Sequence, residues 1–281
     1  MKKITTQSLF AGLALLGLGA CDQTKPATAA ADARPRVLVS NPPTAWLVKQ
    51  IAGDKVIVQT LAHAGGCGHE FQPTDKEMAE AGKARMWFTC GLDFEKSEWA
   101  KGIKKTPVCE GAHEWMSLPN LARVADGIQT NLATQLPKLF PDDRALSGAV
   151  STGFVTRATT AQLLNARHAV LLRDVAPRIQ GITFLADHPA YTHFAADYNL
   201  KQIAIEHDGH EPTDADLAQV VAEAKAAGVK VLFLHAEEHR AEAESVAKAV
   251  GAQVILADPN SENTPELLEM MANALVRAHG K

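Results

Sequence analysis

The stretch that decides the fold is residues 36–61, RVLVSNPPTAWLVKQIAGDKVIVQTL. Its two ends, Arg36–Ser40 and Val56–Leu61, are short apolar runs of the kind that form buried strands. Between them, Ala45–Ala52 carries apolar side chains at helical spacing. A strand, a helix and a second strand in this order predict a βαβ unit with parallel strands. Similar alternation along the rest of the chain predicts an α/β fold.

The remaining elements follow from the same periodicities. Thr74 with Glu77 three residues later has the pattern of a capping box that starts a helix, and Met86–Thr89 is the next expected strand. In the second half we expect strands at 181–186, 201–205, 229–234 and 254–257, and helices at 191–198, 213–227, 241–250 and 264–278.

Residues 142–180 are expected to form one long connecting helix, because Thr160–Asp174 has clear helical periodicity. The fold expected is therefore α/β, with two metal-binding lobes at 35–141 and 181–281. Each lobe should contain a mostly parallel sheet flanked by helices, and the long helix should join them.

Three histidines, His69, His113 and His188, lie in comparable loops, each after a strand-like or polar stretch and before a helix-like one. Parallel sheets gather such loops at the carboxyl ends of their strands, so three loops can bring three imidazoles to one cleft. Three neutral imidazoles suit zinc and leave a fourth position for a carboxylate or water. This arrangement predicts a zinc site.

The first residues predict where the protein is located. Lys2 and Lys3 precede an apolar run, Leu9–Leu18, that is too short to span a bilayer and ends in small residues before Cys21. This pattern resembles a bacterial lipoprotein signal over residues 1–20, with Cys21 as the lipidated first residue of the mature chain. An ordinary cleaved signal is the alternative. Residues 21–34 are rich in Ala, Thr and Pro and are expected to form a flexible tether at the membrane.

The net charge and the cysteine content limit the possible partners and disulfides of the protein. The formal net charge is -4 and no basic stripe stands out, which argues against a nucleic-acid partner. Cys67 and Cys109 lie close in sequence to His69 and His113, so we expect a Cys67–Cys109 disulfide. A Cys90–Cys109 pair and thiolate ligation of a softer metal are the alternatives.

Four segments together resemble a known family. Gly68–Thr74 resembles a Pro-His-x-Tyr-Glu-Pro-Thr signature, and Ala112–Ser117 resembles Pro-His-x-Trp-Leu-Ser. His188–Tyr191 is similar to His-Pro-Ala-Phe, and Gly251–Pro259 ends in a similar Asp-Pro. These motifs, in this order, are those of the metal-specific substrate-binding proteins of zinc and manganese ABC transporters, solute-binding family 9.

The resemblance implies a function and a ligand set. The protein should be a monomer that captures a divalent metal between its lobes and delivers it to a membrane permease, without enzymatic activity. The implied ligands are His69, His113 and His188, with Asp258 or a water molecule in the fourth position. His188 favours zinc over manganese or iron, because manganese-binding members usually carry glutamate there.

Glu70 and Glu114 follow two of the implied ligands directly. We expect them to lie behind the ligands, where a carboxylate or carbonyl that accepts the second imidazole N–H fixes the tautomer.

The sequence is also compatible with three alternative functions. His235-Ala-Glu-Glu-His239 matches a zinc peptidase motif, which requires both histidines on one helical face. Because His235 directly follows an expected strand, we expect it in a loop and disfavour a zinc hydrolase. A manganese- or iron-binding homologue and an adhesin-like surface lipoprotein are the remaining alternatives.

Overall fold

The computed structural model describes residues 34–62, 71–139, 159–206, 212–235 and 240–280. Within them, the N-terminal lobe contains a sheet of four parallel strands. The strands are β1 (Arg36–Val39), β2 (Ile57–Thr60), β3 (Met86–Thr89) and β4 (Lys105–Pro107). Their order in the sheet is β2-β1-β3-β4, so the chain adds β2 on one side of β1 and then crosses to the other side. The predicted βαβ opening is confirmed.

Short polar caps define the helices around this sheet. α1 (Pro42–Ala52) begins after Asn41, whose side-chain oxygen accepts the backbone N–H of Thr44 at 3.0 Å. The predicted capping box at the start of α2 (Asp75–Ala81) is confirmed, because Thr74 and Glu77 each accept the other's backbone N–H. The described part of this lobe also contains three single-turn helices: η1 (Gly53–Lys55), η2 (Asp93–Lys96) and η3 (Glu98–Ala100).

The C-terminal lobe repeats the same strand order without repeating the sequence. Its strands are β5 (Thr183–Ala186), β6 (Lys201–Ala204), β7 (Val231–Leu234) and β8 (Gln253–Leu256), all parallel, in the order β6-β5-β7-β8. Its helices are α7 (Thr192–Asp197), α8 (Asp214–Ala226), α9 (Arg240–Val250) and α10 (Thr264–His279). The elements predicted for this half are confirmed, with small shifts at their ends, and so is the α/β class.

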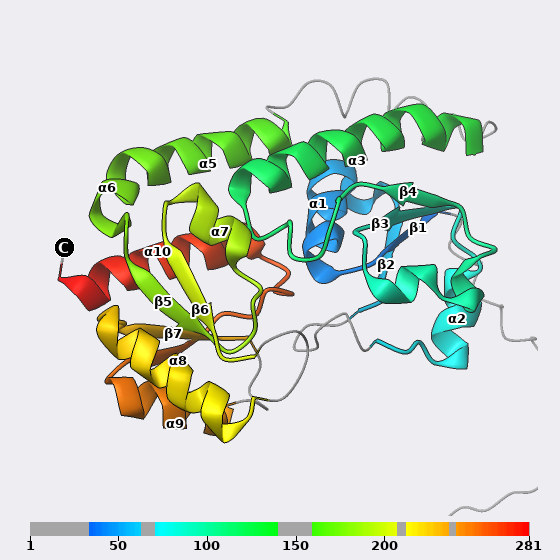
Figure 1. The fold of residues 1–281 in the computed structure, drawn as a ribbon. Coiled ribbons are helices and arrows are strands. Elements are labelled where there is room, and N and C mark those ends of the chain that lie inside the picture. The colour runs from blue at the N-terminus through cyan, green and yellow to red at the C-terminus, as the bar shows by residue number, and fades with distance from the viewer. Residues whose placement is uncertain (1–33, 63–70, 140–158, 207–211, 236–239, 281) are drawn as a thin grey trace, which may run out of the picture. The chain divides into compact units, whose positions relative to one another are not determined.

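Two long helices contact each other and run along one side of both sheets (Figure 1). α5 (Thr160–Asp174) has the bounds that its periodicity predicts, and the short helix α6 (Ala176–Ile179) follows it. The 22-residue helix α3 (Leu118–Leu139) was not predicted. Residues 140–158 lie outside the described part of the chain, so the predicted helical start at 142 stays a prediction.

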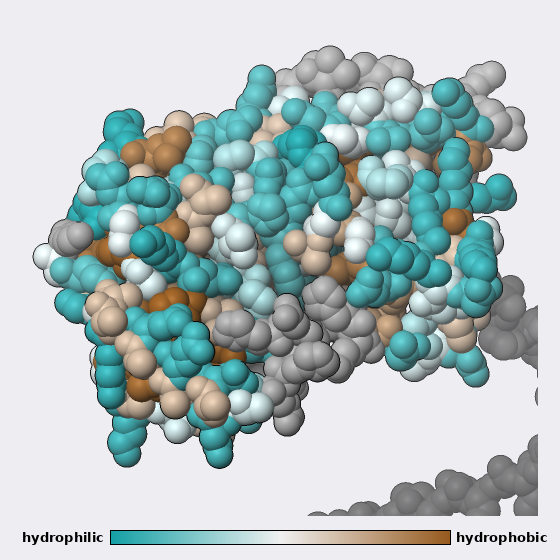
Figure 2. Space-filling model, in the orientation of Figure 1, coloured by the Kyte–Doolittle hydropathy of each residue, from teal (hydrophilic) through white to brown (hydrophobic). Residues whose placement is uncertain are grey.

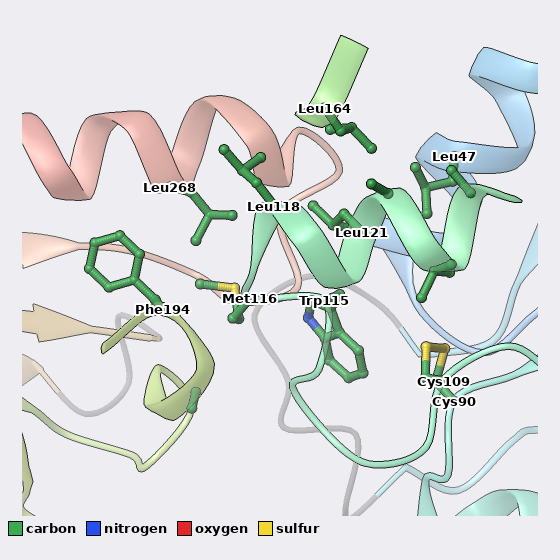
Figure 3. Close-up of a cluster of buried hydrophobic side chains, with 14 of the residues drawn as sticks. Leu47, Cys90, Cys109, Trp115, Met116, Leu118, Leu121, Leu164, Phe194 and Leu268 are labelled. Atoms are coloured by element: carbon green, nitrogen blue, oxygen red, sulfur yellow. A yellow bond between two sulfur atoms is a disulfide. The ribbon is translucent and has the colours of Figure 1, made fainter. Parts of the chain in front are cut away.

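The two lobes share a buried core that runs along α3 (Figure 3). Trp115 and Met116, which precede this helix, and Leu118 at its start are at most 1% exposed. The same cluster contains Leu47 of α1 and Leu268 of α10, so it joins elements of both lobes. Burying each large apolar side chain stabilises the fold by about 1.5–3 kcal/mol. The shared core therefore opposes large movements of one lobe against the other.

The outer surface is mostly hydrophilic on the face that Figure 2 shows. None of the helices in the described ranges is both long and apolar enough to cross a bilayer.

Candidate metal centre

Polar side chains follow all four strands of the second sheet. Asp187 and His188 come directly after β5, Glu206 follows β6, His235 follows β7, and Asp258 follows β8. The strands are parallel, so these residues gather at one edge of the sheet. β5 and β7 are the neighbours at which the strand order reverses, and the crevice at such a point is where α/β proteins bind ligands. The fold itself places His188 and His235 at this crevice.

His188 is buried, with 7% of its surface exposed. Its Nδ1 lies 2.8 Å from Oε2 of Glu206. Its backbone N–H donates to Oδ1 of Asp187 at 2.9 Å. A carboxylate that accepts a hydrogen bond from one ring nitrogen fixes the tautomer and the orientation of the imidazole. Carboxylates hold metal-bound histidines in the same way.

His235 is held by a carboxylate in the same way. Its Nδ1 lies 2.5 Å from Oδ2 of Asp187, and its backbone N–H donates to Oδ1 of Asp187 at 3.0 Å. Burial lowers the pKa of His235, but the hydrogen bond to Asp187 and the charges of Asp187, Asp258 and Glu206 outweigh it and raise the pKa. The surroundings of this ring therefore favour positive charge.

His113 belongs to the loop between β4 and α3 and comes from the other lobe. Its ring centroid lies 5.2 Å from that of His188. Its backbone φ is 59°, in the left-handed region that costs most residues other than glycine about 1 kcal/mol or more. Such strain, where it occurs, is often found at functional sites.

Trp115 fixes the loop of His113 against the second lobe. Its ring lies 5.4 Å from the His113 ring, and its Nε1 donates to the carbonyl oxygen of Pro259 at 2.8 Å. Pro259 is the residue after Asp258. One hydrogen bond thus connects the segment that carries His113 to the segment that carries Asp258.

Asp258 is half-buried at the end of the last strand. Its Oδ1 accepts the backbone N–H of Asn260 at 2.7 Å. Its charge also acts on Tyr191: burial raises the pKa of the Tyr191 phenol well above its ordinary value, and Asp187 and Asp258 act in the same direction. Asp258 therefore contributes negative charge to the crevice.

Glu114 supports the loop of His113 from inside. It is 7% exposed, and its carboxylate accepts the backbone N–H of Glu110 at 2.5 Å and forms an ion pair with Arg123 of α3. These contacts hold the loop on both sides of His113. A contact between Glu114 and the His113 ring itself stays a prediction.

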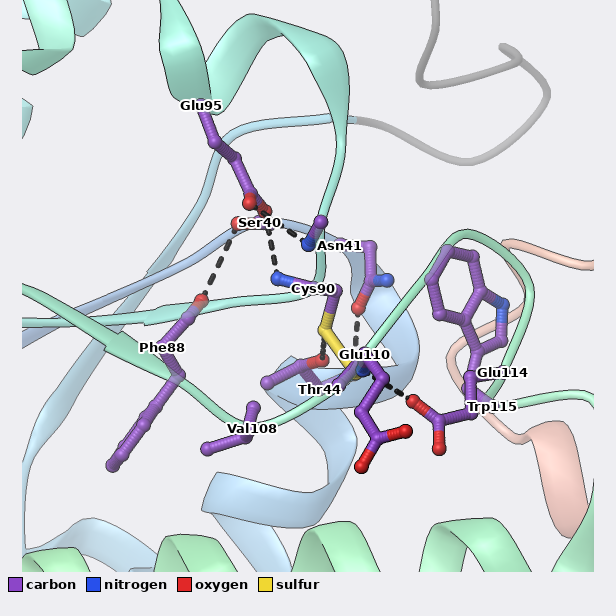
Figure 4. The surroundings of a disulfide bond; sticks show 12 residues. Ser40, Asn41, Thr44, Phe88, Cys90, Glu95, Val108, Glu110, Glu114 and Trp115 are labelled. Carbon is purple, nitrogen blue, oxygen red and sulfur yellow. Dashed lines mark hydrogen bonds between the residues drawn. A yellow bond between two sulfur atoms is a disulfide. The ribbon is translucent and has the colours of Figure 1, made fainter.

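The disulfide differs from the one preferred on sequence grounds (Figure 4). Cys109 pairs with Cys90, at a Cα–Cα distance of 4.3 Å, so the expected Cys67–Cys109 pair is wrong. The reason is the pairing of β3 with β4, in which Thr89 stands opposite Pro107 and the residues that follow both strands become neighbours. Oε1 and Oε2 of Glu95 accept the backbone N–H groups of Cys90 and Gly91 at 2.7 and 2.9 Å.

Several predicted site residues lie outside the described part of the chain. These are Cys21, Cys67, His69 and Glu70. Within the described part, no group of three or more His, Cys, Asp or Glu side chains forms a ready metal site. The predicted ligand set, which needs His69, therefore stays a prediction, although the structure does bring His113 and His188 together.

Sequence reasoning missed three residues of this crevice: Asp187, Glu206 and His235. The first precedes a predicted ligand, Glu206 comes two residues after β6, and His235 directly follows β7. Both strands were predicted. The rule that parallel sheets bind ligands at the carboxyl ends of their strands could have found them. Applying this rule requires the order of the strands in the sheet, which the sequence alone does not give.

Comparison with known proteins identifies relatives of the chain. The family described as zinc-uptake complex component A, periplasmic (ZnuA), matches residues 37–278. The zinc-binding lipoprotein AdcA of Streptococcus pneumoniae is 25% identical over 301 residues, which cover 95% of this chain and 57% of AdcA. The chain thus spans little more than half of that relative. The high-affinity zinc uptake system protein ZnuA of Bacillus subtilis is 25% identical over 240 residues, 73% of this chain and 72% of that protein.

Solved structures agree with the sequence relatives. A crystal structure of ZnuA superposes with a TM-score of 0.72 at 27% identity and covers 87% of this chain and 99% of that one. A zinc-bound deletion mutant of ZnuA gives a TM-score of 0.73 at 27% identity, with 87% and 98% covered.

Proposed function

Because the chain belongs to the family of periplasmic zinc-uptake components, we propose that it captures Zn(II) outside the cytoplasm and delivers it to the permease of an ABC transporter. The observation that carries this proposal is the approach of two imidazoles from different lobes. The rings of His113 and His188 lie 5.2 Å apart at the ends of strands, where this type of fold binds ligands. Their spacing matches that of two imidazoles bound to one zinc ion.

The proposed ligands are His69, His113 and His188. The fourth position is assigned, through the resemblance to the family, to Asp258 or a water molecule. Glu206 supports this role for His188. Its carboxylate accepts a hydrogen bond from the Nδ1–H group of His188, so the lone pair of Nε2 can bind a metal. Imidazole nitrogens favour zinc over manganese, which prefers oxygen ligands.

The mechanism is binding without chemistry. Neutral imidazoles replace the hydration shell of the ion, which is the cargo of the protein and not a cofactor. The shared core and the Trp115–Pro259 hydrogen bond support small movements on loading. The permease would recognise the loaded form through such local changes, and a monomer is sufficient.

We propose an extracytoplasmic location with a lipid anchor. Residues 1–20 would be a signal peptide, Cys21 the lipidated residue, and 21–34 the tether. Labelling cells with a radioactive fatty acid tests this: the wild-type chain should carry label, and Cys21→Ala should not. Label that persists in the variant contradicts the assignment.

The alternatives receive less support. A zinc peptidase motif requires His235 and His239 on one helix. His235 directly follows β7, and His239 lies outside the described residues. A manganese- or iron-binding protein would be expected to carry a carboxylate in place of one of the proposed imidazole ligands. An adhesin-like surface role gains no support from the described residues.

Metal content and competition test the proposal directly. The purified protein should bind one zinc ion tightly, measured by mass spectrometry and by competition with a chromophoric chelator. His69→Ala, His113→Ala and His188→Ala should each lose it, whereas His193→Ala, which removes a half-buried histidine of α7, should keep it. Zinc that stays bound in all three ligand variants would refute the proposed site.

A further inference from the structure

His235 lies beside a proposed ligand at a distance typical of shared coordination. Its ring centroid is 5.4 Å from that of His188, which is 5.2 Å from that of His113. Two imidazoles on one tetrahedral zinc ion, with Zn–N bonds of about 2.0–2.1 Å, have centroids about 5 Å apart. Each of these two spacings therefore matches that of a pair of imidazoles on one ion.

Asp187 determines which nitrogen of His235 can bind a metal. Its carboxylate can only accept hydrogen bonds when ionised, so Nδ1 of His235, 2.5 Å from Oδ2, carries the hydrogen. In the neutral ring the lone pair is then on Nε2. Asp187 also accepts the backbone N–H groups of His188 and His235, so one carboxylate orients both residues. Metal-binding histidines are oriented by carboxylates in this manner.

Charge and burial agree with this role. His235 is 4% exposed, so the ring is fixed by its surroundings before any ligand arrives. Asp258 and Glu206 act on it electrostatically together with Asp187. A buried site surrounded by carboxylates stabilises a divalent cation more strongly than an exposed one, because the interior screens charge less.

We propose that His235 is a ligand of the captured metal, with Nε2 as the donor, and takes the fourth coordination position. The other three ligands are the proposed His69, His113 and His188. Asp258 then contributes charge but no bond. The inference rests on the proposed function, since it assumes that the cleft holds zinc. A site of four imidazoles discriminates against manganese more strongly than one with a carboxylate.

The zinc-loaded wild-type protein gives the first test, which needs no variant. X-ray absorption at the zinc edge should show four imidazole ligands and no carboxylate. Two-bond proton–nitrogen NMR spectra of the histidine rings should show Nε2 of His235 shifting on zinc addition, while Nδ1 keeps its hydrogen. Three imidazoles with one oxygen, or an unshifted His235 resonance, would overturn the proposal.

Variants give the second test. His235→Ala should lower zinc affinity at least about tenfold, since loss of an outer partner alone costs 10–100-fold. His235→Cys, which supplies a thiolate, should retain tight binding, whereas His235→Gln should not. His193→Ala is the matched control and should bind as the wild type does. A purely structural role for His235 would make Cys and Gln equivalent.

The outcomes separate this inference from the proposed function. If the wild type binds no zinc, both fail. If the wild type binds zinc, His188→Ala loses it and His235→Ala binds with unchanged affinity, only the role of His235 fails. Circular dichroism tests whether each variant is folded. If His235→Ala does not fold, the number of imidazole ligands that X-ray absorption finds in the zinc-loaded wild type decides the question.

Discussion

Opening the Cys90–Cys109 disulfide should destabilise the protein by an amount that follows from the fold. The two cysteines are 19 residues apart in sequence and are 0% and 6% exposed. A cross-link of this loop length removes unfolded-state entropy equivalent to about 3 kcal/mol at 25 °C in the chain-entropy relation. Reduction should therefore lower the free energy of unfolding of the zinc-free protein by about that amount.

Urea denaturation followed by circular dichroism measures this difference. With an m-value of about 2–3 kcal/mol/M, the unfolding midpoint of the reduced wild type should fall by about 1 M or more. Cys90→Ala/Cys109→Ala should fall at least as far, because it also loses buried sulfur, and it should no longer respond to reductant. Cys67→Ala is the control and should retain the response to reductant.

The metal site should respond as well. His113 follows Cys109 by four residues, and Glu114 binds the backbone N–H of Glu110 next to the disulfide. Opening the loop gives His113 more freedom, so zinc affinity should fall on reduction. Identical urea midpoints for the oxidised and reduced protein, or a peptide map that joins Cys67 to Cys109, would refute the reasoning.

Three further predictions concern neighbouring residues. Because His113 has a φ of 59°, His113→Gly should be more stable than His113→Ala by about 1 kcal/mol in urea unfolding, although both should lose zinc; equal stabilities would contradict the strain. Burial raises the pKa of the Glu95 carboxyl in the folded protein, although its hydrogen bonds act to lower that pKa. The protonated carboxyl therefore contributes stability at pH values below the pKa of Glu95 in the unfolded chain. This contribution is lost as the pH rises through the pKa of Glu95 in the folded protein. The unfolding free energy of the wild type minus that of Glu95→Gln should thus decrease from about pH 4 to 7, and a constant or rising difference would reverse the sign. Trp115, whose ring lies 5.4 Å from the His113 ring, should change its fluorescence on zinc addition; Trp115→Phe should abolish that change, and Trp99→Phe should leave it.

Local sequence signals were sufficient for most elements of the fold. Met86–Thr89 and Thr160–Asp174 have the predicted bounds, because each is a short apolar or helically periodic run bounded by polar residues. The capping box at Thr74 needs only four residues, and it was found. α3 was missed although its buried side chains, including Leu121, Ile128 and Leu132, follow helical spacing.

Local sequence signals could not predict the order of the strands in each sheet. The nearness of Cys67 to His69 and of Cys109 to His113 favoured a Cys67–Cys109 pair, but the parallel pairing of β3 with β4 brings Cys90 next to Cys109 instead. In the same way, the sequence presented His235 only as a loop residue of a peptidase-like motif, and its place in the crevice follows from the pairing of β7 with β5. That placement set its ring 5.4 Å from His188.

The sequence by itself determined the alternation of strands and helices, the family, and the proposed ligands His113 and His188 in their loops. These properties are encoded in runs of a few residues, where side-chain periodicity and turn chemistry act directly. The tertiary structure alone decided which loops meet, which carboxylate orients which imidazole, and which cysteines pair. Those contacts depend on the order of strands in a sheet, and strand order is set by the packing of the whole lobe.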